Sequence, residues 1–378
     1  MDKVIRLMIA GDYCPHGRVE QLVEEQKYEV IFGNVKKYVE ESDLSIVNFE
    51  TTVIDDNCKP IDKRGPNLGC SIKAIDALKY AGFDCVTLAN NHFRDFGNRG
   101  CELSFNALKS KGLYYVGAGM NASEAKNVLY KKIKGKTIAI CNFCEHEFSI
   151  ADDTTAGCNP IDPIANFYQI VEAKNNADYV VVITHGGHEH FQFPSPRMKQ
   201  LFHFFVDTGA DAVINHHQHC FSGHETYKGK PIYYGLGNFS FDWQDGELWN
   251  TGYFVILTID SNSICSQIYP YKQGCEEIGP TPLKGDEKNK VLGGVEMINA
   301  IIKDDGLLLE KCNSFFDKTQ YPYLFALEPV CNRYIKSLYI RHLYPSKLTQ
   351  KRVLDLRLFL NCESHFERIL RIIERKFR

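Results

Sequence analysis

Five short apolar runs in this chain each end in a cluster of polar side chains, and this repeated pattern limits the folds open to it. The runs have the length and the branched or aromatic residues typical of buried β-strands. The polar residues at their ends are Asp12, Asn48 with Glu50, Asn91 with His92, His185 with Glu189, and His217 with His219. Such regular placement favours one shared site over scattered surface polarity.

Segments with helical spacing alternate with these runs. Residues 71–81 carry apolar side chains at helical spacing and are followed by Gly82, which suits the end of a helix. Helices are also expected at 102–111, 164–176 and 198–207. An alternation of strands and helices predicts a layered α/β domain, in which ligands bind outside the carboxyl ends of the strands.

The strand-end residues mix oxygen and nitrogen donors. This set suits zinc, manganese or iron better than calcium. It contains enough groups for two ions about 3.5–4 Å apart. If residues 213–219 stay extended, His217 and His219 share one face of the segment. His188, His190 and His216 are expected to be spare histidines on exposed loops.

The pattern changes along the chain, which predicts a main domain over residues 1–260, a connecting segment over 261–292 and a helical extension over 293–378. Helices are expected at 294–311, 329–343 and 354–376. The last is amphipathic and ends in basic residues. Such a helix packs on its own domain or lies on a membrane, and packing is the commoner use.

Charge and composition exclude several partners. A net charge of −3 provides no electrostatic basis for binding nucleic acid. The chain begins directly with a strand-like run, and it contains no apolar stretch of about 18 residues that could span a bilayer. Its fourteen cysteines are scattered, unlike those of a small disulfide scaffold. We expect a cytoplasmic protein without a transmembrane segment.

Longer motifs resemble a known family. In order they are GD (11–12), NFE (48–50), LANNHFRDFG (88–97), HGGHE (185–189), HHQH (216–219) and YKGKPIYYGLGNFSFD (227–242). This series, over residues 4–260, resembles the CapA family of capsule or poly-γ-glutamate synthesis proteins. The resemblance implies the four-layer α/β/β/α sandwich of the calcineurin-like metallophosphoesterases, here with a helical C-terminal extension.

The resemblance also implies roles for individual residues. Asp12 and Glu50 would hold or bridge two divalent ions, which are expected to be Mn²⁺, Zn²⁺ or Fe²⁺. One ion would be completed by Asn91, His185 and His217, and the other by His219.

Three further residues are implied to be catalytic. His92 would act as general acid or electrophile beside the leaving group, with Asp95 orienting its ring. Glu189 would serve as a second base, or its carboxylate would contact the metal ligands without binding the metal itself. Asn238 would support the metal-side loop through hydrogen bonds.

Two positions depart from what the resemblance implies. The superfamily usually carries Asp-x-His at the first strand, whereas this chain has Asp12-Tyr13-Cys14. CapA-like proteins generally share this departure, which leaves one metal site short of a protein ligand unless Cys14 or His16 supplies it. Gly186 stands where the family usually has tryptophan, which predicts a more open pocket wall. A loop over 54–70 carries Lys63 and Arg64, either as cations for an anionic substrate or as a solvated tip.

Three functional hypotheses follow. The first is a metal-dependent hydrolase that acts in the metabolism of an anionic polymer such as poly-γ-glutamate or a capsular glycan. The second is a non-catalytic accessory protein that binds the polymer or a membrane synthase complex. The third is a phosphodiesterase on a small phosphoester.

Overall fold

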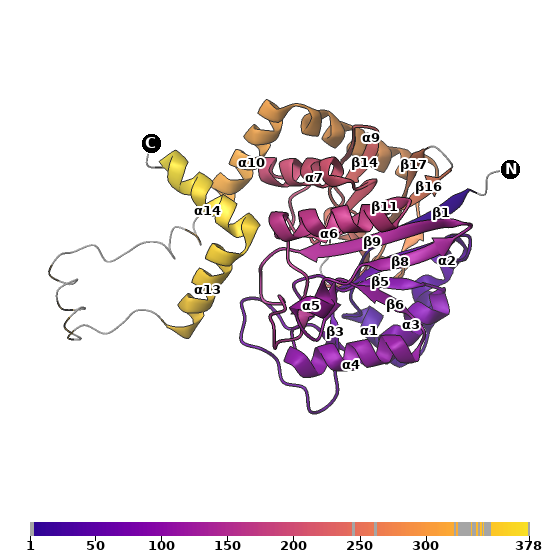
Figure 1. Cartoon of the computed structure of the whole chain (residues 1–378), viewed down its shortest axis with the longest axis horizontal. Coiled ribbons are helices and arrows are strands. Elements are labelled where there is room, and N and C mark those ends of the chain that lie inside the picture. The colour runs from indigo at the N-terminus through magenta and orange to yellow at the C-terminus, as the bar shows by residue number, and fades with distance from the viewer. Residues whose placement is uncertain are drawn as a thin grey trace.

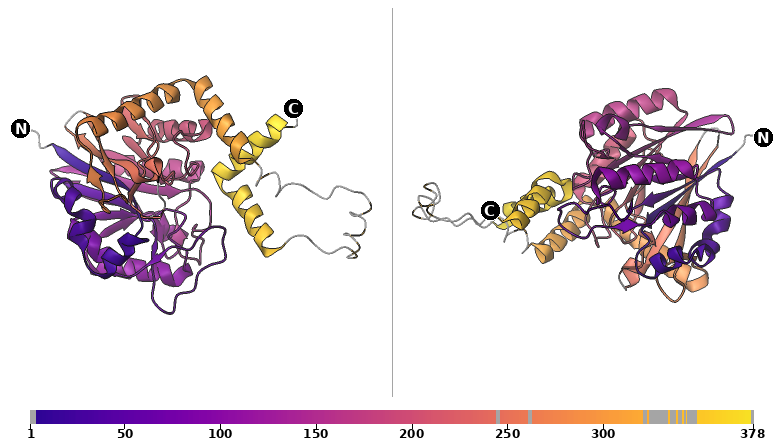
Figure 2. Two further views of the ribbon diagram at one scale, coloured as in Figure 1. Left: turned by 180° about the vertical axis from the view of Figure 1, so that it is seen from behind. Right: turned by 90° about the horizontal axis from the view of Figure 1, so that it is seen from below.

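Two β-sheets packed face to face form the centre of the molecule. The computed structural model describes residues 4–243, 246–260, 263–320 and 349–376, together with the single residues Tyr323, Tyr334, Leu338, Arg341 and Leu343. Helices cover the outer face of each sheet, and two C-terminal helices lie at one end (Figures 1 and 2). This confirms the predicted four-layer α/β/β/α sandwich with a helical C-terminal extension.

The first sheet has the order β18-β17-β16-β1-β2-β5-β6, and β15 also pairs with β1. Strands β1, β2, β5 and β6 are parallel, whereas β16 runs antiparallel to β1. The strands are β1 (Ile5–Tyr13), β2 (Leu44–Phe49), β5 (Cys85–Thr87), β6 (Tyr114–Val116), β15 (Asn238–Ser240), β16 (Thr251–Ile259), β17 (Ile264–Lys272) and β18 (Thr281–Pro282).

The second sheet has the order β13-β14-β12-β11-β9-β8, with β9, β11, β12 and β14 parallel. Its strands are β8 (Leu129–Ile133), β9 (Lys136–Cys144), β11 (Tyr179–His185), β12 (Ala212–His216), β13 (His224–Tyr227) and β14 (Lys230–Tyr233). Two short ladders pair β3 (Thr52–Val53) with β4 (Gly69–Cys70) and β7 (Ala118–Gly119) with β10 (Gly157–Cys158).

The side chains of β1 show how the layers are held together. Leu7 and Ile9 belong to the core between the two sheets, whereas Met8 and Ala10 belong to the core under the outer helices. Successive side chains of a strand point to opposite faces, so an unbroken apolar run suits a strand that is buried on both faces.

Helices complete the outer layers. Those against the first sheet are α1 (Arg18–Glu24), α2 (Tyr28–Glu40), α3 (Lys73–Ala81) and α4 (Gly97–Ser110). Those against the second are α6 (Pro163–Asn176) and α7 (Pro196–Thr208), and α5 (Ala122–Ala125) and α8 (Glu247–Asn250) are single turns. As predicted, Gly82 ends α3, in a left-handed conformation with φ of 92°.

The first sheet extends further along the chain than the sequence pattern indicated. Residues 264–272, expected in a connecting segment, form β17 and pair along their whole length with β16. The mixed polar and apolar order in this strand fits its position near the sheet edge, where one face is solvated. The sheet therefore continues past residue 260 to Pro282.

The C-terminal region is divided into more helices than predicted. The helix expected at 294–311 is two helices, α9 (Gly285–Lys303) and α10 (Asp305–Thr319), because Asp304 caps α10 by accepting from the amides of Gly306 and Leu307. The helix expected at 354–376 is also two, α13 (Gln350–Asn361) and α14 (Glu363–Lys376), with Cys362 extended between them. The helix predicted at 329–343 lies outside the described residues.

Helix α14 packs on the main domain, as expected for its apolar face.

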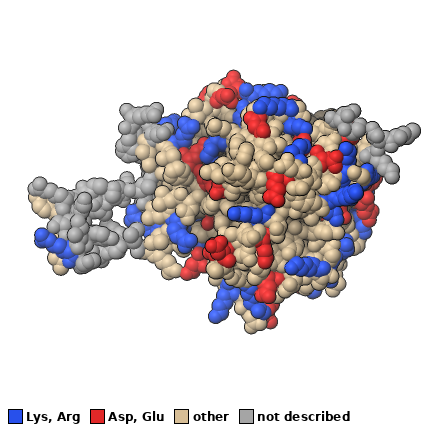
Figure 3. All heavy atoms as spheres, in the orientation of Figure 1, with Lys and Arg blue, Asp and Glu red and all other residues tan. Residues whose placement is uncertain are grey.

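Within the described part of the chain, none of the helices combines the length and the apolar character that a membrane crossing requires. Basic and acidic side chains are interspersed over the face of the molecule shown in Figure 3.

Candidate metal centre

The strand-end residues meet at one edge of the two sheets. Asp12 lies in β1 and Glu50 directly follows β2, whereas His185 ends β11 and His217 directly follows β12. All four residues are buried, and Asp12 and Glu50 are each 0% exposed. Each sheet therefore contributes carboxyl-end residues to one buried site.

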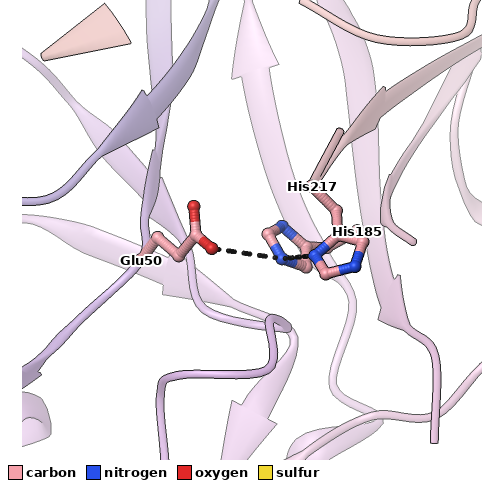
Figure 4. A group of neighbouring side chains, drawn as sticks. All are labelled: Glu50, His185 and His217. Atoms are coloured by element: carbon pink, nitrogen blue, oxygen red, sulfur yellow. Dashed lines mark hydrogen bonds and ion pairs between the residues drawn. The ribbon is translucent and has the colours of Figure 1, made fainter. Parts of the chain in front are cut away.

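Glu50, His185 and His217 form the first group. The Nε2 atom of His185 lies 3.5 Å from Oε1 of Glu50 and 3.0 Å from Nδ1 of His217. Asn91 Oδ1 lies 2.9 Å from the same Nε2 atom. Figure 4 shows Glu50 reaching from one side toward the two imidazoles, and the three potential ligand atoms lie within 4.8 Å of one another.

Asp12, Glu50 and His219 form the second group. His219 places Nδ1 3.7 Å from Oδ2 of Asp12 and Nε2 3.7 Å from Oε1 of Glu50. Asn238 Oδ1 lies 2.9 Å from His219 Nδ1, so the expected support from Asn238 has a contact in the structure. Glu50 is shared by both groups, which is the arrangement that a carboxylate between two ions requires.

The donor set fits divalent cations. Among the described residues, Oδ2 of Asp12 and both carboxylate oxygens of Glu50 are buried without a hydrogen-bond partner. Burial, and then the Asp12 carboxylate, raise the pKa of Glu50 well above its ordinary value. Unpaired buried carboxylates are costly unless a cation compensates them. Burial also lowers the pKa of His185, which keeps its imidazole in the neutral form that binds metals.

Asn48 connects the two sheets at this site. Its Nδ2 atom donates to Oδ1 of Asp12 at 2.8 Å and lies 3.3 Å from Nδ1 of His185. One amide group therefore touches a candidate ligand from each sheet and holds both in position.

His217 and His219 reach the site by a different route from the one predicted. Strand β12 ends at His216, and both later histidines have positive φ, 92° at His217 and 53° at His219. Non-glycine residues rarely adopt this conformation, which costs about 1–3 kcal/mol. The chain therefore bends after β12, and this bend, not an extended segment, directs the rings of His217 and His219 toward the carboxylates.

His92 forms a tight unit with Asp95 and Lys63. Nδ1 of His92 lies 2.7 Å from Oδ2 of Asp95, and the same oxygen accepts from the amide of Leu68 at 2.7 Å. Lys63 forms an ion pair with Asp95 and places Nζ 3.1 Å from His92 Nδ1. Burial and the Lys63 cation lower the pKa of His92 to about 4, against the opposite effect of Asp95.

Lys63 does not fit the solvated alternative for its loop. The loop around it contains charges, proline and glycine, which are typical of a solvated tip. In the structure only 2% of the Lys63 side chain is exposed, because Asp95 pairs with it. Arg64 does fit the solvated alternative, since half of its side chain is exposed.

Two carboxylates lie on the solvent side of the centre. Glu189 is exposed and has an oxygen close to both His217 and His219. Glu147, which the sequence analysis missed, places Oε1 3.6 Å from Nε2 of His217. The only signal for Glu147 was its position after β9, in a stretch that otherwise looks irregular.

The two candidates for the missing ligand lie elsewhere. Cys14 packs in an apolar cluster with Leu68, Phe241 and Trp249, and burial raises the pKa of its thiol well above the ordinary value. His16 stacks on Trp243, with ring centroids 4.5 Å apart. Neither belongs to the two groups described above.

The more open wall predicted at Gly186 is wrong. A Cβ at this position would lie 2.7 Å from Cγ of Glu145, so the Glu145 side chain occupies the space. Arg197 pairs with this carboxylate, and Ser364 of α14 donates to it at 2.8 Å.

Two of the three spare histidines are not on exposed loops. His216 is buried and contacts the carbonyl oxygens of Ala10 and Thr184 at 3.0 and 3.3 Å. His188 is buried against α14, whereas His190 is exposed as predicted. His216 and His188 are buried because segments distant in sequence pack against them. The local sequence pattern does not indicate such contacts.

Comparison with known proteins now adds to this geometry. The family model described as "Bacterial capsule synthesis protein PGA_cap" matches residues 6–243. The chain belongs to this family. The matched part of this PGA_cap protein contains every candidate ligand and excludes helices α9, α10, α13 and α14.

Named relatives agree with the family. The protein is 35% identical to the "Capsule biosynthesis protein CapA" of Bacillus anthracis over 246 residues, which are 63% of this chain and 60% of that protein. It is also 35% identical to the "PGA biosynthesis protein CapA" of Bacillus subtilis (strain 168), over 64% of each chain. A "Probable polyglutamine synthesis accessory protein" of Mycobacterium tuberculosis is 27% identical over 54% of this chain and 57% of its own. The matches therefore span less than two thirds of these relatives.

Proposed function

We propose that this PGA_cap protein is a metal-dependent hydrolase that acts on an anionic polymer of the capsule or poly-γ-glutamate class. The observation that carries the proposal is the shared carboxylate of Glu50, buried without a hydrogen-bond partner among the described residues and flanked by His185 and His219. The names of the Bacillus relatives indicate the polymer class.

The protein residues would divide the work as follows. Asp12, Glu50 and His219 would hold one divalent ion, and Glu50, Asn91, His185 and His217 the other. Manganese, zinc and iron all suit this mixture of carboxylate, amide and imidazole donors. When bound, such ions supply a Lewis acid that polarises a phosphoryl or carbonyl group.

His92 is the candidate for proton transfer. A carboxylate oxygen can only accept, so the proton between His92 and Asp95 lies on Nδ1 of the ring. Nε2 is then left to take a proton and pass it to the leaving group. Asp95 keeps the ring in this tautomer, and Lys63 neutralises the carboxylate.

Metal content would test the proposal first. Protein purified without a metal-affinity tag should carry near-stoichiometric transition metal by mass spectrometry. Asp12→Ala and His217→Ala should lose it, whereas His203→Ala should not, because His203 lies on α7 and contacts Glu225 outside the centre. Wild-type protein that takes up neither manganese nor zinc would contradict the metal centre.

Turnover would test the reaction. Wild-type protein with Mn²⁺ should cleave γ-linked glutamate oligomers or a chromogenic phosphodiester, and His217→Ala should be inactive. His92→Ala should keep its metal but lose about 10²–10⁴-fold in rate, the usual contribution of a general acid or base. Cleavage of the phosphodiester alone would favour the small-phosphoester alternative.

The accessory alternative has one specific support, the name of the mycobacterial relative, which describes that protein as an accessory protein. It predicts a different result. The protein would bind metal and co-purify with a membrane synthase, and His92→Ala would leave polymer production unchanged in cells.

A further inference from the structure

A cavity of about 620 Å³ joins the metal centre to the C-terminal helices. Asn91, His92 and His217 line it on the side of the centre, whereas Phe359 and Arg368 of α13 and α14 line the opposite side. Residues 358–368 lie outside the stretch 6–243 that matches the family model. The outer wall of this cavity is therefore built by the C-terminal extension.

Arg368 is a buried cation with incomplete pairing. Only 9% of the residue is exposed, and its guanidinium donates to Tyr323 Oη at 2.7 Å and to His188 Nδ1 at 3.0 Å. The guanidinium also lies over the rings of Phe315 and Tyr323, 4.8 and 5.1 Å from their centroids. Among the described residues, no carboxylate forms an ion pair with it, and its Nε atom has no hydrogen-bond partner.

His188 offers a second donor in the same cavity. The residue is 3% exposed, and burial followed by the Arg368 charge lowers the pKa of its ring well below the ordinary value. Because Arg368 can only donate, Nδ1 of the neutral ring accepts, and the ring proton lies on Nε2. Within the described part of the chain, this Nε2 atom also lacks a hydrogen-bond partner.

The other charges around the cavity are placed differently. Lys63 pairs with Asp95 and Arg64 with Asp355, and Lys318 is exposed at the rim. The acidic residues of the lining, Glu147 and Glu189, lie beside His217, and Glu147 also lies close to Cys362 and His365 at the C-terminal helices. Arg368 is thus the buried cation of this lining that forms no ion pair among the described residues, and Glu189 acts on it only as a neighbouring charge.

We propose that Arg368 and His188 bind an oxyanion of the substrate, a carboxylate or a phosphate, while the bond to be cleaved lies at the metal centre. This proposal rests on the proposed function for the identity of the substrate. An anion compensates a buried guanidinium, and the guanidinium fork matches the two oxygens of a carboxylate or phosphate. The C-terminal extension then selects substrates with a negative group at a set distance from the reacting bond.

Calorimetric titration of the full-length protein would test the site. The probes are inorganic phosphate and a γ-linked glutamate tetramer, each measured with Mn²⁺ and with EDTA. Arg368→Met should weaken binding of at least one probe about 10- to 100-fold, also in EDTA, as expected for hydrogen bonds to a charged group. The matched control is Arg375→Met on the same helix, because Arg375 is exposed and pairs with Asp317 outside the cavity.

The outcomes separate this proposal from the hydrolase. Equal affinities of wild-type protein and Arg368→Met, or no binding of either probe by wild-type protein, would overturn the anion site. Arg368-dependent binding in a protein without turnover would contradict the hydrolase and retain the site. If Arg368→Met does not fold, Arg368→Lys keeps the charge without the fork and should show a smaller loss of affinity. Binding of only one probe identifies phosphate or carboxylate as the preferred group.

Discussion

Glu50 concentrates the chemistry of the site in one residue. It is buried, both groups of potential ligands share it, and its oxygens have no hydrogen-bond partner among the described residues. In the metal-free protein burial raises the pKa of this carboxyl and so lowers stability at neutral pH, whereas a bound cation would compensate its charge.

Glu50→Gln should therefore have opposite effects in the two states. In EDTA at neutral pH the variant should be more stable than wild type by about 1–3 kcal/mol, because the amide buries no charge and needs no proton to become neutral. With saturating Mn²⁺ it should be less stable than wild type, because a ligand shared by both groups is lost. Chemical denaturation under both conditions measures these free energies of unfolding.

Glu102→Gln is the control, since Glu102 is exposed on α4 and should behave as wild type in both conditions. A Glu50→Gln protein that is less stable than wild type even in EDTA would show that the carboxylate has a partner other than metal.

For individual residues, the sequence predicted the candidate metal ligands better than it predicted the other side chains that surround the site. Asp12, Glu50, His185, His217 and His219 were expected from strand ends, and the structure brings them together. Glu147, Arg368 and the pairing of Lys63 with Asp95 were not expected, because each of these residues lies in a loop or helix whose burial depends on segments far away along the chain.

Glu145, whose side chain fills the space next to Gly186, holds helix α14 in place. Glu145 accepts from Ser364 at 2.8 Å and contacts Cys362 Sγ at 3.6 Å, at the start of this helix. Burial raises the pKa of Glu145, but Arg197 and Ser364 outweigh it and hold the pKa below its ordinary value. The break at Cys362 lets α14 reach this carboxylate, which explains why one predicted helix is two.

Gly186→Ala should loosen α14. The added Cβ would lie 2.7 Å from Glu145 Cγ, so the carboxylate must move away from Ser364. We expect a loss of about 1–3 kcal/mol, typical of overpacking, and faster cleavage of α13 and α14 by trypsin. Limited proteolysis followed by mass spectrometry measures this.

The control for this experiment is Gly293→Ala in α9, where an added Cβ meets nothing within 4 Å. Cleavage of the Gly186→Ala protein at the rate of this control would show that Glu145 does not hold the helix.

The whole molecule is two sheets whose carboxyl ends meet at the candidate metal centre. Asp12 and Glu50 come from the first sheet, whereas His185, His217 and His219 come from the second. An ion that binds residues of both sheets stabilises their packing, and binding to the folded state alone raises stability by mass action.

Mn²⁺ should therefore raise the thermal stability of the wild-type protein in a concentration-dependent way, by about 2.7 kcal/mol at 100 times the dissociation constant. Differential scanning calorimetry measures the effect. His217→Ala should show a much smaller shift, and His203→Ala the full shift. A melting temperature independent of Mn²⁺, in protein that demonstrably binds the ion, would mean that the unfolded chain binds the ion as tightly as the folded protein does.

The sequence by itself determined a layered α/β domain and the residues of the candidate centre, and the four-layer α/β/β/α order was implied by the resemblance to the CapA family. Apolar runs and the polar residues that end them are local patterns, and parallel strands bring their carboxyl ends to one edge whatever lies between them. The tertiary structure alone decided the outer wall of the cavity. Glu145 and Ser364 are 219 positions apart, and Arg368 is buried against His188 only because α14 docks there. Burial of a cation depends on what packs over it, and spacing along the chain does not encode that contact.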